Sequence, residues 1–248
     1  MITTQRRECV KKRPCALVTG GAIRLGRAIA LALARHGMDV AIAYHRSRSE
    51  AAKAIRELSA AGAHALALRA DLADPRAAGR LVREAARALG GLDVLVNNAA
   101  VFVRTPLATT TPAAYDRVLD LNLRGAFFAS QAAARIMRNG HIVNVGDAGA
   151  TGAWPGYIPY TVSKAGVVAL TRALATALRD RSIAVNCVAP GAVLRPPGFS
   201  RARWTRVTGG QPVRIENVVA AVVYYATCPL NVTGRIRPVL ATKSRGRR

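Results

Sequence analysis

Residues 14–26 read PCALVTGGAIRLG, an apolar run that passes directly into a glycine-rich turn. The run at 14–19 predicts a buried strand, and residues 24–36 predict a helix that ends at Gly37. Glycines between a strand and a helix permit a tight turn and let backbone N–H groups approach a phosphate, which the positive helix end also attracts. This stretch therefore predicts an α/β fold that begins with a nucleotide-binding turn.

The alternation of strand and helix continues along the chain. Further strands are expected at 39–44, 64–69, 92–96, 141–145, 183–188 and 236–240. Further helices are expected at 48–61, 75–89, 112–137, 157–179 and 214–227. Such regularity predicts a Rossmann-type, doubly wound sheet of seven parallel strands with helices on both faces. Ligands of these sheets bind beyond the carboxyl ends of the strands.

Length and composition fit a single domain. The 248 residues are 51% hydrophobic and 5% aromatic, which suits helices packed on a buried parallel sheet. We expect the domain to cover 14–240, with a loose, Arg-rich insertion near 195–212, between basic tails at 1–13 and 241–248. The sequence has no apolar run of membrane-spanning length and no signal core, so we predict a cytoplasmic protein without a membrane partner.

The net charge of +24 favours anionic partners. The basic residues are not interleaved with aromatic ones, so solvated surface arginines are the simpler interpretation and nucleic acid is not the expected partner. The sequence has four cysteines, Cys9, Cys15, Cys187 and Cys228. They form no C-x-x-C pair, which predicts buried thiols in a reducing compartment and no metal site.

The candidate cofactor site continues from the glycine-rich turn to the ends of the next strands. Arg46 stands 20 residues after Gly26, where an acidic residue would bind the ribose hydroxyls of NAD. An arginine binds a 2′-phosphate instead, and Arg24 and Ser47 can add further donors, so we predict NADPH rather than NADH. Asp71 either accepts from the adenine amino group or caps the next turn. The predicted set is Gly20, Arg24, Leu25, Gly26, His45, Arg46, Ser47, Asp71, Leu72, Asn98, Ala99 and Ala100.

Two residues on the long helix predict proton transfer. Tyr160 and Lys164 are four residues apart and share a helix face. A tyrosine with a pKa of ~10 is a poor acid at neutral pH, and a nearby ammonium would lower that pKa. Lys164 can also bond the nicotinamide ribose.

Together the motifs resemble the short-chain dehydrogenase/reductase family over about residues 14–195: the T-G-x-x-x-R-x-G turn, N-N-A-A at 97–100, Asn122, Tyr160-x-x-x-Lys164 and Pro190-Gly191. The resemblance implies that Tyr160 is the general acid, with Lys164 as its partner and ribose ligand. It implies that Asn122 belongs to a proton relay. Pro190 and Gly191 would lie by the nicotinamide, and the long helices would build a homotetramer.

One position departs from that family. The family usually has a serine 13 residues before the tyrosine, to hold a substrate carbonyl, and this chain has Asp147. An ionised carboxylate accepts hydrogen bonds but cannot donate one, so it opposes a ketone oxygen and suits an N–H-rich pterin ring. Asp147, together with Arg24 and the HRS run at 45–47, makes this sequence similar to the pteridine reductases of the family. In those enzymes the Asp is part of the catalytic set. Their pterin stacks on a Phe, and Phe102 occupies the matching place.

The sequence therefore predicts NADPH-dependent reduction of a dihydropterin or dihydrofolate. One alternative is a carbonyl or 3-oxoacyl reductase, against which the missing serine argues. Another is a catalytically silent protein that binds nucleotide or nucleic acid. A lost serine remains an alternative for Asp147, and loop packing for Phe102. A shortened lid at 195–212 and the ending PVLATK at 238–243, where the family shows Asp-Gly-Gly, leave the substrate and the assembly open.

Overall fold

The computed structural model describes residues 13–152 and 154–241. This part of the chain is built around one parallel sheet, with β1 near its middle. Within this part of the chain the strand order is β3-β2-β1-β4-β5-β6-β7. The strands are β1 (Cys15–Val18), β2 (Asp39–Tyr44), β3 (Ala65–Arg69), β4 (Val94–Asn97), β5 (Gly140–Val145), β6 (Ile183–Pro190) and β7 (Ile236–Val239). The predicted seven-stranded, doubly wound sheet is confirmed. Its order reverses between β1 and β4, and this reversal places the ligand crevice of such folds there.

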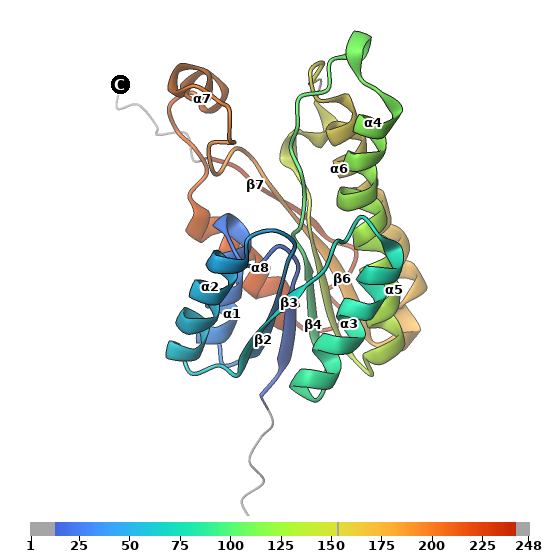
Figure 1. Cartoon of the computed structure of the whole chain (residues 1–248). Helices are drawn as coiled ribbons and strands as arrows, with labels where there is room; N and C mark the ends of the chain where they lie inside the picture. The colour runs from blue at the N-terminus through green and yellow to red at the C-terminus, as the bar shows by residue number, and fades with distance from the viewer. Residues whose placement is uncertain (1–12, 153, 242–248) are drawn as a thin grey trace, which may run out of the picture.

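Helices cover both faces of the sheet (Figure 1). One face carries α1 (Arg24–Arg35), α2 (Arg48–Ala60) and α8 (Ile215–Thr227), and the other carries α3 (Pro75–Leu89), α5 (Gly125–Ile136) and α6 (Ile158–Ala177). Alternate strand residues serve the two layers, because successive side chains of a strand point to opposite faces. Val18 packs in the core with Ile29 of α1, and Leu17 packs in the opposite core with Leu81 of α3.

The helix predicted at 112–137 is interrupted. It begins as α4 (Pro112–Leu119), where Thr111 accepts a capping bond from the Ala114 amide at 3.2 Å. The segment Asp120–Arg124 is a π-helical turn, after which α5 resumes the α-helix. A π-turn shifts the following side chains around the helix axis and is common at functional sites. The segment has no proline or glycine interruption, so the sequence offered no sign of it.

The insertion at 195–212 is not a loose segment. It contains α7 (Arg201–Thr208), whose first turn is capped by the Ser200 hydroxyl and whose end is Gly209 at φ +59°. Ser200 and Gly209 are helix start and stop signals that the sequence analysis overlooked. α7 and α4 both project beyond the edge where the strands end (Figure 1).

Other sequence predictions concern the surface and the tails. Cys187 and Cys228 are buried free thiols, and burial raises the pKa of both. Along the described residues, no helix is both long and apolar enough to cross a bilayer.

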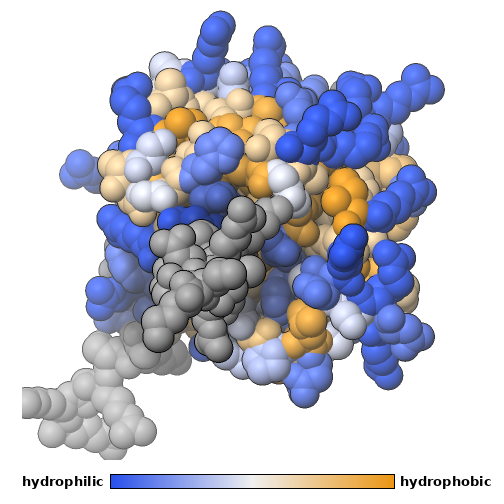
Figure 2. Space-filling model, turned by 90° about the horizontal axis from the view of Figure 1, so that it is seen from below, coloured by the Kyte–Doolittle hydropathy of each residue, from blue (hydrophilic) through white to orange (hydrophobic). Residues whose placement is uncertain are grey.

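On the face of the molecule seen from below, hydrophilic side chains ring the outline and hydrophobic residues lie between them (Figure 2). Tails were predicted at 1–13 and 241–248, and of these residues 1–12 (Cys9 among them) and 242–248 lie outside the described residues.

Candidate active site

A cavity of about 650 Å³ lies where the turns after β1, β2, β3 and β4 meet. It is lined by every predicted cofactor residue of these turns: Gly20, Arg24, Leu25, Gly26, His45, Arg46, Ser47, Asp71, Leu72, Asn98, Ala99 and Ala100. Small-molecule sites usually measure about 300–1,000 Å³, so this volume suits a bound nucleotide. Arg117 of α4 and Leu121 also line the cavity, and the sequence analysis missed both.

The floor of the cavity is made of backbone that leaves no room for side chains. A Cβ added to Gly26 would lie 2.2 Å from the Gly20 carbonyl oxygen and 2.5 Å from the side-chain Nδ2 of Asn98. Gly20 has φ +63°, in the left-handed region that favours glycine. The Thr19 hydroxyl accepts from the Asn98 and Ala99 amides at 2.9 and 3.0 Å, which ties the turn to the end of β4. This floor fits a pyrophosphate held by backbone N–H groups at the start of α1.

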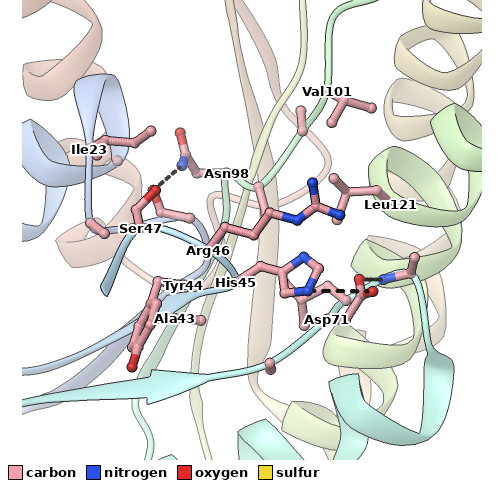
Figure 3. A pocket seen from close by; sticks show the side chains of 18 of the residues that line it. Ile23, Ala43, Tyr44, His45, Arg46, Ser47, Asp71, Asn98, Val101 and Leu121 are labelled. Atoms are coloured by element: carbon pink, nitrogen blue, oxygen red, sulfur yellow. Dashed lines mark hydrogen bonds and ion pairs between the residues drawn. The ribbon is translucent and has the colours of Figure 1, made fainter. Parts of the chain in front are cut away.

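One end of the cavity is positively charged. The Arg46 side chain extends across the opening toward Leu121 (Figure 3). No acidic side chain of the described residues pairs with Arg46, so its guanidinium is available to a phosphate. Asp71 accepts from the Ala73 amide at 3.1 Å and lies 3.8 Å from His45. The capping role of Asp71 is therefore present, and its place in the cavity leaves the adenine contact as a prediction.

Arg24 has a different partner from the one predicted. It has φ +53°, and its guanidinium donates to the carbonyls of Leu194 and Arg195 at 3.2 and 3.1 Å. Arg24 therefore links the glycine-rich turn to the segment that leads into α7. Its role as a phosphate ligand stays a prediction.

The Asp147 carboxylate points at the phenol of Tyr160, as the substrate argument requires. The Tyr160 hydroxyl donates to one carboxylate oxygen at 2.6 Å, and the Gly149 amide donates to the other at 2.7 Å. Asp147 thus caps the short 3-10 turn Ala148–Thr151 and faces α6. Burial first, and then the negative charge and hydrogen bond of Asp147, raise the pKa of Tyr160 well above its ordinary value.

The predicted effect of Lys164 on Tyr160 is wrong for this arrangement. Lys164 is buried, with 4% of its surface exposed, and its Nζ donates to the Val145 carbonyl at 2.8 Å and lies 6.0 Å from the centre of the Tyr160 ring. Its charge does not outweigh burial and the adjacent carboxylate, so the pKa of Tyr160 rises instead of falling. Burial also lowers the pKa of Lys164, against the opposing charge of Asp147. The phenol therefore keeps its proton in this arrangement, and it is a weaker acid than an ordinary tyrosine as long as Asp147 accepts its hydrogen bond.

Asn122 is fixed by the π-turn behind this pair. Its amide oxygen accepts from the Val101 amide at 2.8 Å, and its nitrogen donates to the Val101 carbonyl at 3.0 Å and to Ser163 at 3.1 Å. None of these bonds reaches Tyr160 or Lys164, so the proton relay remains a prediction. Pro190 ends β6, and Gly191 donates to the Val239 carbonyl at 2.9 Å, which leaves their contact with a nicotinamide equally untested.

Phe102 lies beside Tyr160 but already has an aromatic partner. Its ring stacks on Tyr157 at 4.3 Å with an interplanar angle of 4°, and it meets Tyr160 edge to face at 4.6 Å. Trp154 and Phe199 complete this aromatic cluster. Sequence reasoning singled out Phe102 alone, although Tyr157 comes three residues before Tyr160 in the same run.

The chain resembles known oxidoreductases over most of its length. A family model described as short chain dehydrogenase matches residues 14–203. A 3-oxoacyl-[acyl-carrier-protein] reductase FabG from Staphylococcus aureus is 39% identical over 189 residues, which are 75% of this chain and 76% of that protein. A hydroxynaphthalene reductase-like protein Arp2 from Metarhizium robertsii is 35% identical over 218 residues, 87% of this chain and 80% of that protein.

A solved structure agrees with these relatives. A short chain dehydrogenase from Burkholderia cenocepacia, crystallised in complex with NADP, superimposes with a TM-score of 0.86 at 36% identity. The match covers 93% of this chain and 98% of that one.

Proposed function

The chain belongs to the short-chain dehydrogenase family, and on that premise we propose that it is an NADP(H)-dependent reductase in which Tyr160 donates the proton. The observation that carries this proposal is that the Tyr160 phenol, the buried Lys164 and the glycine-floored cavity all lie at the carboxyl edge of one sheet. The catalytically silent alternative would leave this arrangement without a use.

The cofactor is NADP(H). The Burkholderia relative holds NADP, and Arg46 stands at the cavity without an acidic partner among the described residues. Gly20, Gly26 and the start of α1 would hold the pyrophosphate, while Arg46 and Ser47 would hold the 2′-phosphate. When bound, the reduced nicotinamide supplies a hydride to an electrophilic carbon.

The chain's own residues supply the proton. Tyr160 gives its hydroxyl proton to the oxygen or nitrogen of the double bond that accepts the hydride, and the phenolate left behind is stabilised by the nearby ammonium of Lys164. Asn122 would hold the π-turn and the Val101 backbone in place behind the pair. Asp147, bonded to the phenol in this structure, decides which substrates can compete for that proton.

A carbonyl compound is the first substrate candidate. The sequence analysis put a pterin first, but the relatives above are named for reducing 3-oxoacyl groups and hydroxynaphthalenes, and they favour the carbonyl alternative. A carbonyl oxygen would have to take the phenol proton away from Asp147, since the carboxylate itself has no hydrogen to offer.

A dihydropterin or dihydrofolate is the second candidate. Asp147 favours it because a carboxylate can accept from the ring N–H groups, while Tyr160 protonates the ring nitrogen of the reduced C=N bond. Phe102, displaced from Tyr157, would then stack on the ring.

Turnover assays would separate these functions. The purified protein is given NADPH with an aromatic ketone, with a 3-oxoacyl thioester and with dihydrobiopterin, and loss of reduced cofactor is followed. Oxidation of NADPH by a carbonyl compound supports the first candidate, and oxidation by dihydrobiopterin supports the second. Cofactor binding without turnover of any compound, together with salt-sensitive binding of nucleic acid, would contradict the reductase.

A homotetramer is also proposed, and sedimentation would test it.

A further inference from the structure

One charged side chain is built into the aromatic cluster beside Tyr160. The Arg203 guanidinium, on α7, lies 4.0 Å from the centre of the Phe199 ring and 5.7 Å from that of Tyr157. It also donates to the Tyr157 hydroxyl at 3.0 Å. Tyr157 in turn stacks on Phe102, which contacts Tyr160. Contacts between side chains therefore connect the guanidinium to the proton donor without a break.

The guanidinium keeps unused hydrogen-bond donors. An arginine has five N–H donors, and in Arg203 the Nη2 nitrogen donates to the Tyr157 hydroxyl. No carboxylate of the described residues forms an ion pair with it, and Asp147, the acid of this site, is occupied by Tyr160 and the Gly149 amide. The contact with the Phe199 ring and the bond to the Tyr157 hydroxyl together hold the guanidinium in place, so a ligand would find the remaining donors already oriented.

A second cation, Arg104, lies near the cluster. The Arg104 Nε lies 3.9 Å from the position that a Gly156 Cβ would take, directly before Tyr157. Residues 105 and 157 are joined by an isolated parallel bridge, which holds Arg104 next to the aromatic cluster. Arg104 and Arg203 thus both lie near Tyr157, which adds positive charge to the surroundings of the aromatic cluster.

We propose that Arg203 is a specificity-determining residue that binds an anionic group, a carboxylate or phosphate, at the far end of the substrate. The aromatic cluster would contact the flat or apolar part between that group and the reacting bond. This proposal rests on the proposed reductase only for the reaction at Tyr160, because binding of an anion by Arg203 can be measured without turnover. Charge-assisted, bidentate bonds of this kind are the strong ones in proteins.

Matched probes that differ in charge test the assignment. The carbonyl pair, 4-carboxybenzaldehyde and its neutral methyl ester, differs mainly in charge. The pterin pair, dihydrofolate and dihydrobiopterin, differs in charge and also in the size of the side chain, so the carbonyl pair decides the assignment. KM and kcat are measured with NADPH, and Kd is measured on the NADP-loaded protein by quenching of Trp154 and Trp204, the two tryptophans of the chain. The variants are Arg203→Gln and, as a control, Arg206→Gln, which removes the same charge from another exposed position of α7.

We expect Arg203→Gln to raise KM and Kd of the carboxylate member about 10- to 100-fold, the effect of losing a bond to a charged group. The neutral member should change less than about twofold, kcat should stay the same, and Arg206→Gln should leave the ratio of the two members as in the unaltered protein. An equal loss for both members would assign Arg203 a purely structural role and overturn the proposal. So would the lack of any preference for the carboxylate member in the unaltered protein. Binding of the charged probes without turnover would overturn the reductase but not the role of Arg203.

Discussion

Replacing Asp147 by serine should change which substrates the enzyme reduces. In the structure the Tyr160 hydroxyl donates its only hydrogen to the Asp147 carboxylate, with 2.6 Å between the two oxygens, so a carbonyl substrate must first break that bond. A hydrogen bond to a charged group contributes about 1.5–3 kcal/mol and a neutral one about 0.5–1.5 kcal/mol. Serine can accept from the phenol only through a neutral bond, and it can itself donate to a carbonyl oxygen.

The difference between the two bonds, about 1–1.5 kcal/mol, corresponds to roughly a 5- to 10-fold change in rate. We expect Asp147→Ser to raise kcat/KM for an aromatic ketone by about that factor, while kcat/KM for dihydrobiopterin falls by about 100-fold through loss of a group that assists proton transfer. The assay is the initial rate of NADPH oxidation with each substrate, together with the Kd of NADPH, which should not change because Asp147 does not line the nucleotide cavity.

Two controls make the result decisive. Asp147→Asn keeps the shape and removes the charge, so it should reproduce the direction of the ketone effect. Tyr160→Phe should abolish both reactions. If Asp147→Ser left the ketone and pterin rates both as they were, the carboxylate would be a bystander and the substrate argument would be refuted.

Four further predictions concern the described contacts. Arg46→Glu should raise the KM for NADPH about 10- to 100-fold and leave the KM for NADH within about threefold, as measured by initial rates, because only the 2′-phosphate uses the guanidinium. Gly26→Ala should lower the free energy of unfolding by about 1–3 kcal/mol and weaken NADPH binding, because its Cβ would lie 2.2 Å from the Gly20 oxygen. Gly79→Ala in α3, where the nearest atom is 3.4 Å away on a flexible arginine, should instead stabilise the fold by up to about 1 kcal/mol in a denaturant titration. The raised pKa of Tyr160 keeps its proton in place as pH rises, so reductase activity should stay level across roughly pH 7–9, and Asp147→Asn should move the alkaline fall of kcat/KM to lower pH.

The sequence predicted the sheet and the cavity because each depends on local patterns. Apolar strands followed by glycine, asparagine or small residues indicate both the parallel sheet and the turns that line its edge. Arg46 could be placed at the cavity in the same way, since its distance from Gly26 along the chain is set by one helix and one strand.

Features that depend on contacts between distant segments were not predictable in this way. The pKa of Tyr160 depends on burial and on a carboxylate 13 residues away, which together outweigh an ammonium four residues away. The stacking of Phe102 on Tyr157 and the contact of Arg203 with Phe199 arise only when the loop after β4, the start of α6 and α7 meet. α7 itself was predictable from Ser200 and Gly209, but the arginine-rich composition of that segment obscured those signals.

The bonds from Arg24 to the carbonyls of Leu194 and Arg195 join parts of the chain that are 170 and 171 positions apart. The same residue borders the nucleotide cavity, so a phosphate that bound Arg24, as the sequence analysis predicts, would compete with the α7 segment for one guanidinium. Thermodynamic linkage is reciprocal. If a bound nucleotide draws Arg24 away from these carbonyls, the α7 segment opens more easily. Closing of the segment then weakens nucleotide binding by the same free energy. Nucleotide binding and the closing of the α7 segment would thus be coupled through a single side chain.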